Sequence, residues 1–93
     1  MQVKWTTSAN RDLVRLYEFL RPVNPPAAKK AVRLLVRESK RLHTHPLLGA
    51  PLGEYAPRNV RHLIIGDYEL RYEVTEDVLY ILRLWHTRED RTL

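Results

Sequence analysis

Residues 68–74 alternate strictly between apolar and polar side chains, which is the period of a half-buried strand. Residues 60–65 and 78–86 are also rich in aliphatic and aromatic residues, and residues 78–86 are apolar on nearly both faces, as in a central strand. Gly66-Asp67, between the first two segments, is the Gly-X pair of a two-residue type II′ turn. The carboxy-terminal half therefore predicts a meander of three antiparallel strands.

The length of each connection fixes which side chains share a face. The Gly66-Asp67 turn pairs Ile65 with Tyr68 and puts His62 and Arg71 on the polar face. For the second hairpin we expect an odd-length loop at residues 75–77. This loop keeps a leucine from each strand on the core side.

The expected register of that hairpin pairs Leu70 with Leu82 and sets Arg83 opposite Glu69. A slip by one residue would bury Arg83. His86 has the opposite parity from Arg83, so only a strand end or a bulge would bring the two side chains to one face.

Residues 2–20 predict a strand followed by a helix. Gln2 to Thr6 alternates, with Val3 and Trp5 on one side, and Ser8 is the expected N-cap of the helix. An apolar stripe at helical spacing follows, formed by Leu13, Leu16, Tyr17 and Leu20.

Proline-rich residues 21–26 must end this helix, because proline lacks an amide proton and clashes with the preceding turn. Asn24 is then the expected cap of a second helix, with Pro25 at its first position. The expected buried side of that helix consists of Ala28, Ala31, Leu35 and Leu42. The fold class is α+β in the order β-α-α-β-β-β, with a helical hairpin packed on one face of a small, mainly antiparallel sheet.

Composition limits the possible functions. At 93 residues, with 44% hydrophobic and 29% charged side chains, residues 1–93 are expected to form one globular domain. The chain has no cysteine, no apolar amino-terminal run and no segment long enough to span a bilayer, so we expect a cytoplasmic protein without disulfides. The formal charge of +5 favours polyanionic partners, either a nucleic acid or an acidic protein segment.

The order of elements, together with four local motifs, resembles the RelE/ParE superfamily of toxins from bacterial type II toxin–antitoxin pairs. The motifs are the segment from Trp5 to Leu20 with Ala9, Asp12 and Leu13, then His45-Pro46-Leu47-Leu48-Gly49, then Val60-Arg61 to Gly66-Asp67-Tyr68, and Leu84-Trp85-His86-Thr87-Arg88-Glu89-Asp90. The resemblance covers nearly the whole chain. It implies a toxin neutralised by a cognate antitoxin, in a hetero-oligomer with it.

The superfamily contains ribosome-dependent messenger RNA endonucleases, which are RelE-like, and inhibitors of DNA gyrase, which are ParE-like. RelE-like toxins carry an arginine where this chain has Glu69, and a terminal tyrosine that is missing after Arg88. The ending resembles ParE more closely, with His86, Arg88 and Asp90 in approximately matching places. Inhibition of gyrase is therefore the preferred hypothesis for the function, with RNA cleavage as the alternative.

Residues for RNA cleavage can also be found. A ribonuclease needs a base for the 2′-hydroxyl, an acid for the leaving oxygen and cations for the phosphate. The candidates are His86, Arg88, His62 and Arg71. The YafQ-type ribonucleases of the superfamily use three histidines and an aspartate, which His45, His62, His86 and Asp67 could match. The alternative is a polar outer face with a Glu69–Arg83 ion pair across the strands.

A basic stripe on the second helix is the candidate docking surface for the target or the antitoxin. Lys29, Arg33, Arg37 and Lys40 recur at helical spacing, and Arg83 is added from the last strand. The alternative is an ordinary solvated face. Neither a metal nor a cofactor is expected, because four scattered histidines without cysteine lack a tight ligand spacing.

Overall fold

The computed structural model describes residues 1–89 as an α+β fold in which two helices pack against a mixed five-stranded sheet. The elements are β1 (Gln2–Trp5), α1 (Thr7–Leu20), α2 (Pro25–Lys40), β2 (Ala50–Pro51), β3 (Asn59–Ile65), β4 (Tyr68–Val74) and β5 (Val78–His86). Short 3₁₀ turns lie at Arg41–His43 and Gly53–Tyr55. The predicted fold class and the meander are confirmed.

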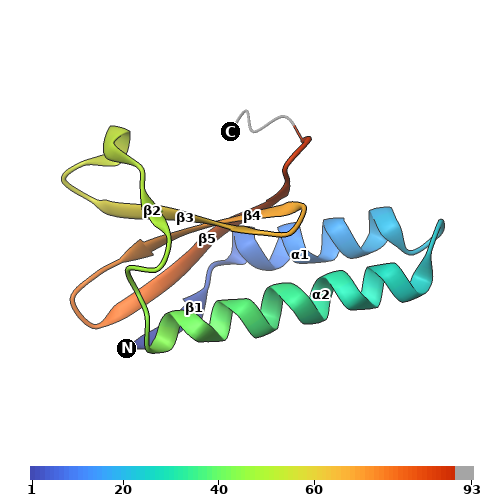
Figure 1. Cartoon of the computed structure of the whole chain (residues 1–93), viewed down its shortest axis with the longest axis horizontal. Coiled ribbons are helices and arrows are strands. Elements are labelled where there is room, and N and C mark those ends of the chain that lie inside the picture. Colours follow the sequence, from blue (N-terminus) through green and yellow to red (C-terminus); the bar gives the residue numbers. More distant parts are fainter. Residues whose placement is uncertain (90–93) are drawn as a thin grey trace.

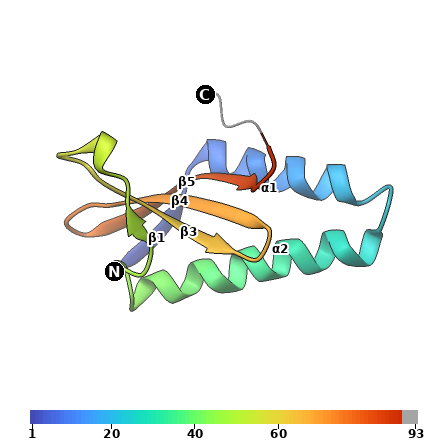
Figure 2. The same ribbon diagram turned by 45° about the horizontal axis from the view of Figure 1, so that its top comes forward.

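The sheet has the strand order β1-β5-β4-β3-β2, in which only β1 and β5 run parallel. The two helices lie side by side, and their connecting turn projects beyond the sheet (Figures 1 and 2). The buried core joins both helices to the inner sheet face, with Leu16 of α1, Leu35 of α2, Leu70 of β4 and Leu84 of β5 all nearly inaccessible to solvent. In the described part of the chain no helix is long and apolar enough to cross a membrane.

The two helix caps differ in how well they could be predicted. Asn24 caps α2 as expected, accepting a hydrogen bond from the Ala27 amide at 3.1 Å, with Pro25 at the first position. The prediction of Ser8 as the cap of α1 was wrong, because Thr6 takes that role. The Thr6 hydroxyl accepts from the Ala9 amide at 3.1 Å and donates to the carbonyl of Leu82 at 3.1 Å. Contact with β5 thus fixes where α1 begins.

The β3–β4 hairpin has the predicted register, with Ile65 opposite Tyr68 and His62 opposite Arg71. Gly66 has φ = 58°, whereas Asp67 stays on the negative side, as a type II′ turn requires. A side chain at Gly66 would be strained in this conformation.

Replacement of this turn glycine is therefore expected to be costly. Gly66→Ala should lower the free energy of unfolding by about 1 kcal/mol, because alanine is disfavoured in the left-handed region. Gly66→Asn should cost less, since asparagine tolerates that region better. Urea denaturation of the two variants measures the difference. Equal losses would contradict the backbone explanation.

The register of the β4–β5 hairpin was predicted wrongly. Leu70 lies opposite Leu84 and not Leu82, because Val74 pairs with Leu79 at the turn and Leu82 forms a bulge. Thr75 and Val78 close the four-residue turn through the Thr75 amide and hydroxyl, which both donate to the carbonyl of Val78. Because the turn has an even number of residues, it shifts the pairing of β4 and β5 by one residue relative to the predicted register. The extra residue in the bulge then brings Leu70 and Leu84 opposite each other on the inner face.

The bulge lets β5 bury apolar side chains on both sides of it. Leu79 and Ile81 before the bulge, and Leu84 after it, are all inaccessible on the inner face. Arg83 consequently points to the outer face and lies opposite Arg71. A continuous strand would have turned Arg83 toward the core.

The irregular connection expected after α2 contains one more strand. β2 pairs with β3 through Ala50–His62 and Pro51–Arg61. The buried Tyr72 hydroxyl fastens the preceding loop, because it donates to the carbonyl of Pro46 and accepts from the amide of Gly49, both at 2.8 Å. Burial raises the pKa of Tyr72, so the phenol is neutral in the folded protein.

Candidate functional site

A groove lies between the second half of α1 and the end of the β4–β5 pair. It encloses about 580 Å³ and is lined by Arg15, Leu16, Phe19, Leu20, Tyr68, His86, Arg88 and Glu89. Phe19 is 78% exposed at its rim, and the Tyr68 and His86 rings meet edge to face at 5.5 Å. The groove thus combines an apolar wall with an imidazole and a carboxylate.

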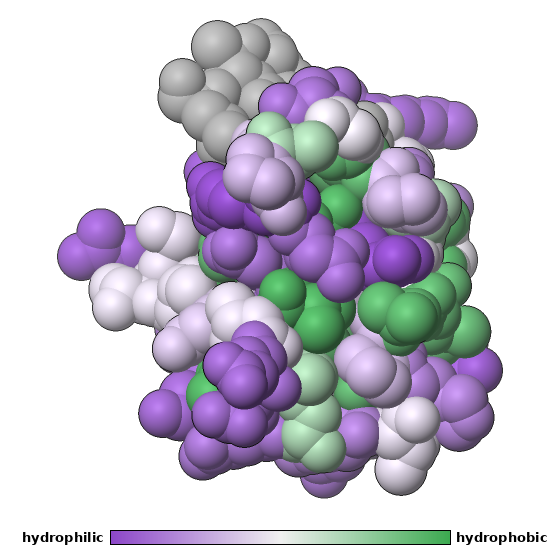
Figure 3. All heavy atoms as spheres, turned by 90° about the vertical axis from the view of Figure 1, so that its left-hand side faces the viewer, coloured by the Kyte–Doolittle hydropathy of each residue, from purple (hydrophilic) through white to green (hydrophobic). Residues whose placement is uncertain are grey.

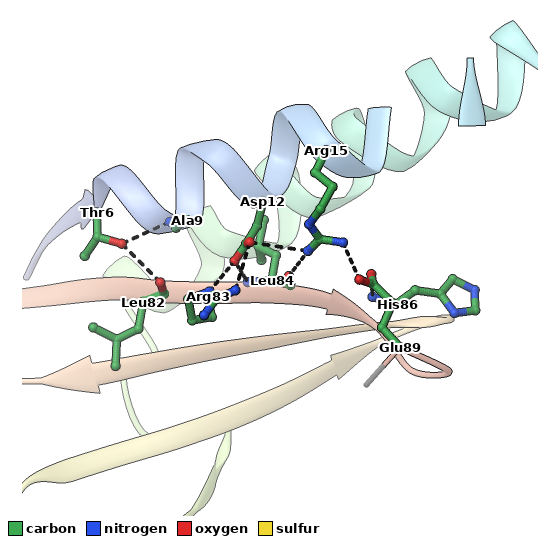
Figure 4. A network of polar contacts seen from close by, with 9 residues as sticks. All are labelled: Thr6, Ala9, Asp12, Arg15, Leu82, Arg83, Leu84, His86 and Glu89. Carbon is green, nitrogen blue, oxygen red and sulfur yellow. Dashed lines mark hydrogen bonds and ion pairs between the residues drawn. The ribbon is translucent and has the colours of Figure 1, made fainter. Parts of the chain in front are cut away.

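Strand β5 has an open edge next to this groove. β1 covers β5 only from Val78 to Ile81, so the later backbone groups at that edge have no strand partner. Side chains of α1 replace the strand (Figure 4). Asp12 accepts from the Leu84 amide at 2.9 Å, and Arg15 donates to the Leu84 carbonyl at 3.0 Å.

Asp12 is the centre of this edge network. It is 5% exposed and binds the Nε atom of Arg83 at 2.7 Å and Nη2 of Arg15 at 3.3 Å (Figure 4). Burial alone raises the pKa of Asp12, but the hydrogen bonds from Arg83 and the Leu84 amide outweigh it and hold the pKa below its ordinary value. Asp12 is therefore ionised and joins α1 to β5.

The network continues to His86. Arg15 also pairs with Glu89, whose carboxylate accepts from the His86 amide at 2.9 Å. Burial alone raises the pKa of Glu89, but the contacts with Arg15 and the His86 amide outweigh it and lower the pKa. The His86 Nδ1 atom accepts from the Arg88 amide at 3.2 Å. These contacts hold the turn after β5 in place and engage the Nδ1 atom of His86.

The outer sheet face carries a second cluster of polar and aromatic side chains. Glu69 is only 3% exposed and lies 3.3 Å from Nη2 of Arg71 and 3.6 Å from Nδ1 of His62. The guanidinium groups of Arg71 and Arg83 lie 4.8 and 5.0 Å from the centre of the Trp85 ring. The predicted Glu69–Arg83 pair was wrong, because the bulge sets Trp85 opposite Glu69.

The four residues considered for RNA cleavage are therefore divided between two places. His86 and Arg88 line the groove, whereas His62 and Arg71 lie on the opposite face of the sheet. The bulge at Leu82 precedes Arg83 and leaves the opposite parity of Arg83 and His86 unchanged. Between residues 1 and 89 no group of three His, Cys, Asp or Glu side chains could hold a metal ion.

The basic residues considered for docking are also divided. Lys29, Arg33 and Arg37 are exposed on α2, whereas Arg83 is engaged with Asp12 and Trp85 at the sheet. At the end of the molecule with the amino terminus, apolar surface is broken into small patches among hydrophilic side chains (Figure 3). The basic α2 face and the apolar groove are thus separate candidate surfaces.

Sequence reasoning overlooked Asp12 as a functional or structural centre. Asp12 stands three residues after Ala9 and four before Leu16, and all three are buried on one side of α1. A carboxylate in a buried helical stripe needs a cationic partner, because an unpaired buried charge is costly. The helical spacing was a usable signal, but the identity of Arg83 as partner depended on the bulge.

Comparisons with known proteins agree with this architecture. Residues 3–91 match the family model described as the ParE toxin of the type II toxin–antitoxin system parDE. Toxin RelE3 of Caulobacter vibrioides is 32% identical over 87 residues, which cover 89% of this chain and 90% of that protein. A chain of the chromosomal ParDE system from P. aeruginosa superposes with a TM-score of 0.78 at 29% identity, covering 92% of this chain and 95% of the other. The chain thus belongs to the ParE toxin family of type II toxin–antitoxin systems, within the RelE/ParE superfamily.

Proposed function

We propose that this toxin inhibits DNA gyrase by binding to it, without a catalytic centre of its own, and that a cognate antitoxin neutralises it in the cytoplasm. The observation that carries the proposal is the division of the candidate catalytic residues between two sheet faces. Cleavage of RNA requires a base, an acid and cations around one phosphate. His62 and Arg71 cannot share a phosphate with His86 and Arg88 across the sheet.

The contacts of Arg71 and Glu69 on the outer sheet face also support inhibition of gyrase over RNA cleavage. Arg71 is held by Glu69 and by the Tyr55 hydroxyl, at 3.3 and 3.0 Å. Glu69 stands where RelE-like relatives have an arginine, so this chain has a buried carboxylate where a phosphate-binding cation would be needed. A carboxylate there repels a phosphate.

RNA cleavage on the ribosome is the second candidate. It is favoured by His86, which lines the groove together with two cations, Arg15 and Arg88. The imidazole of His86 could act there as a proton donor or acceptor. This mechanism would have to work with the groove residues alone.

The groove is also the surface that suits an antitoxin segment. Its apolar wall and exposed Phe19 offer an anchor for a segment that folds as it binds. The solved relative comes from a ParDE system, which supports pairing with an antitoxin. Co-purification of this chain with the product of the adjacent gene tests that pairing.

Two assays on the purified toxin distinguish the candidate functions. Under the proposal, the toxin blocks supercoiling of relaxed plasmid by gyrase and leaves ribosome-bound messenger RNA intact. His86→Ala should change gyrase inhibition by about tenfold at most, the effect of one lost contact. His43→Ala, which removes an exposed histidine that belongs neither to the groove nor to the candidate catalytic residues, is the matched control.

The opposite pattern would overturn the proposal. If messenger RNA is cleaved while gyrase is unaffected, and if His86→Ala reduces cleavage by about 10² to 10⁴, the groove is a ribonuclease site. If neither target is affected by a folded toxin that arrests growth, both candidates fail.

A further inference from the structure

Helix α2 runs along one side of the molecule (Figure 1). Its exposed side carries basic residues without ion-pair partners in the described part of the chain. This basic face consists of Lys29, Lys30, Arg33, Arg37 and Lys40. All five are exposed and have no ion pair or hydrogen bond among residues 1–89. By contrast, six arginines elsewhere in that range are paired with carboxylates, namely Arg15, Arg21, Arg41, Arg58, Arg71 and Arg83.

The five cations share one side of the helix. Successive helical residues turn by about 100°, so Lys29 to Lys40 fall within a sector about 100° wide. The buried side of α2, marked by Ala28, Ala31 and Leu35, faces away from that sector. The row from Lys29 to Lys40 is about 16 Å long at 1.5 Å per residue. Helical geometry therefore makes a straight, rigid and uncompensated row of charge.

We propose that the basic face of α2 binds the phosphate backbone of duplex DNA. Lysine and arginine bind phosphates through charge and hydrogen bonding, and such contacts need no apolar component. Steps of four residues advance the row by about 6 Å, and each strand of a duplex carries one phosphate per about 3.4 Å of helix axis, so the two charge spacings are of similar scale. A straight row on a rigid helix suits the regular backbone of a stiff duplex better than a flexible single strand.

The composition of the face favours DNA over an acidic protein segment. Within the sector there is no aromatic, leucine, isoleucine, valine or methionine side chain. Protein interfaces normally depend on buried aromatic and aliphatic anchors, which this toxin offers at Phe19 and the groove instead. The only acidic residue within α2 is Glu38, which is paired with Arg41 at 3.2 Å.

Binding of duplex DNA at α2 is separate from inhibition of gyrase and does not depend on it. The interaction involves only the toxin and DNA, whereas the supercoiling assay also needs gyrase. DNA bound at α2 would bring the toxin to the duplex on which gyrase acts. The toxin could therefore bind DNA without inhibiting gyrase, or inhibit gyrase without binding DNA at α2.

The test measures binding of the full-length toxin to a labelled duplex of about 20 base pairs across a salt series. The expected dissociation constant is on the order of 10⁻⁵ M near physiological salt. If all five cations contact phosphates, the slope of log K against log salt is about −4.5. Lys29→Gln/Arg33→Gln should weaken binding roughly tenfold per removed contact near 0.1 M salt and make the slope shallower by about 2.

Lys4→Gln/Arg11→Gln is the matched control, because it removes one exposed lysine and one exposed arginine outside α2. The control should keep the wild-type slope. Glutamine has nearly the helix propensity of lysine and arginine at the three helical positions, and Lys4 is an exposed residue of β1. Circular dichroism should therefore show intact folds in both variants. An equal loss in the two variants would overturn the proposal, since diffuse net charge would then explain the binding. The proposal would also be overturned if no duplex binding were detected at low salt. Tighter binding of single-stranded RNA or of a glutamate-rich peptide would overturn it as well.

Discussion

Replacing Asp12 with alanine is expected to lower the free energy of unfolding by about 3 kcal/mol, as is typical when one partner of a buried ion pair is removed. The change leaves the Leu84 amide at the β5 edge without its acceptor and Arg83 without its carboxylate. Both losses weaken the attachment of α1 to β5. Urea denaturation followed by circular dichroism measures the effect.

Asp77→Ala is the control, because it removes an exposed aspartate in the β4–β5 turn. It should change the free energy of unfolding by no more than about 0.5 kcal/mol. Asp12→Asn should be intermediate, because the amide oxygen can still accept from Leu84 but carries no charge. A loss below about 1 kcal/mol for Asp12→Ala would contradict the role assigned to the edge network.

The same carboxylate gives stability a defined pH dependence. The folded-state pKa values of Asp12 and Glu89 are lowered. The pKa of Glu73 is lowered as well, by its hydrogen bond with Arg58. Below about pH 4.5 the unfolded chain therefore binds more protons than the folded one, so acid favours unfolding. Stability should be fully present above that pH and fall as the pH drops toward the folded-state pKa values. In Asp12→Ala this decline should be shallower.

Gly49→Ala is expected to cost about 2 kcal/mol, the typical effect of forcing an extra methyl group into a filled site. A Cβ atom at Gly49 would lie 2.6 Å from the backbone oxygen of His62 and 2.8 Å from the Tyr72 ring. The backbone oxygen belongs to β3 and cannot turn aside as a flexible side chain would. Thermal and urea unfolding of the variant measure the loss.

Gly53→Ala is the matched control, because a Cβ atom there has no heavy-atom neighbour within 4 Å. It should leave stability unchanged or raise it slightly, since alanine restricts the unfolded chain more than glycine does. If both variants lost stability equally, the close approach of Gly49 to β3 and Tyr72 would not explain the result.

Motif order was enough to identify the toxin superfamily from the sequence, but the candidate site was only partly predictable. His86 and Arg88 were found and do share the groove. Their separation from His62 and Arg71 followed from strand parity, and the bulge left it unchanged. Asp12 was missed because its partner, Arg83, is remote in the sequence, and the groove depends on packing between α1 and the end of the sheet.

The sequence alone determined the features that depend on neighbouring residues. Strand alternation, the Gly66-Asp67 turn and the Asn24-Pro25 start of α2 are local, because each follows from backbone preferences or from bonds across a few residues. Tertiary structure decided the rest. The cap at Thr6 and the buried charge of Asp12 depend on contact between α1 and β5, and the bulge at Leu82 belongs to the pairing of β4 with β5. No local pattern specified these contacts.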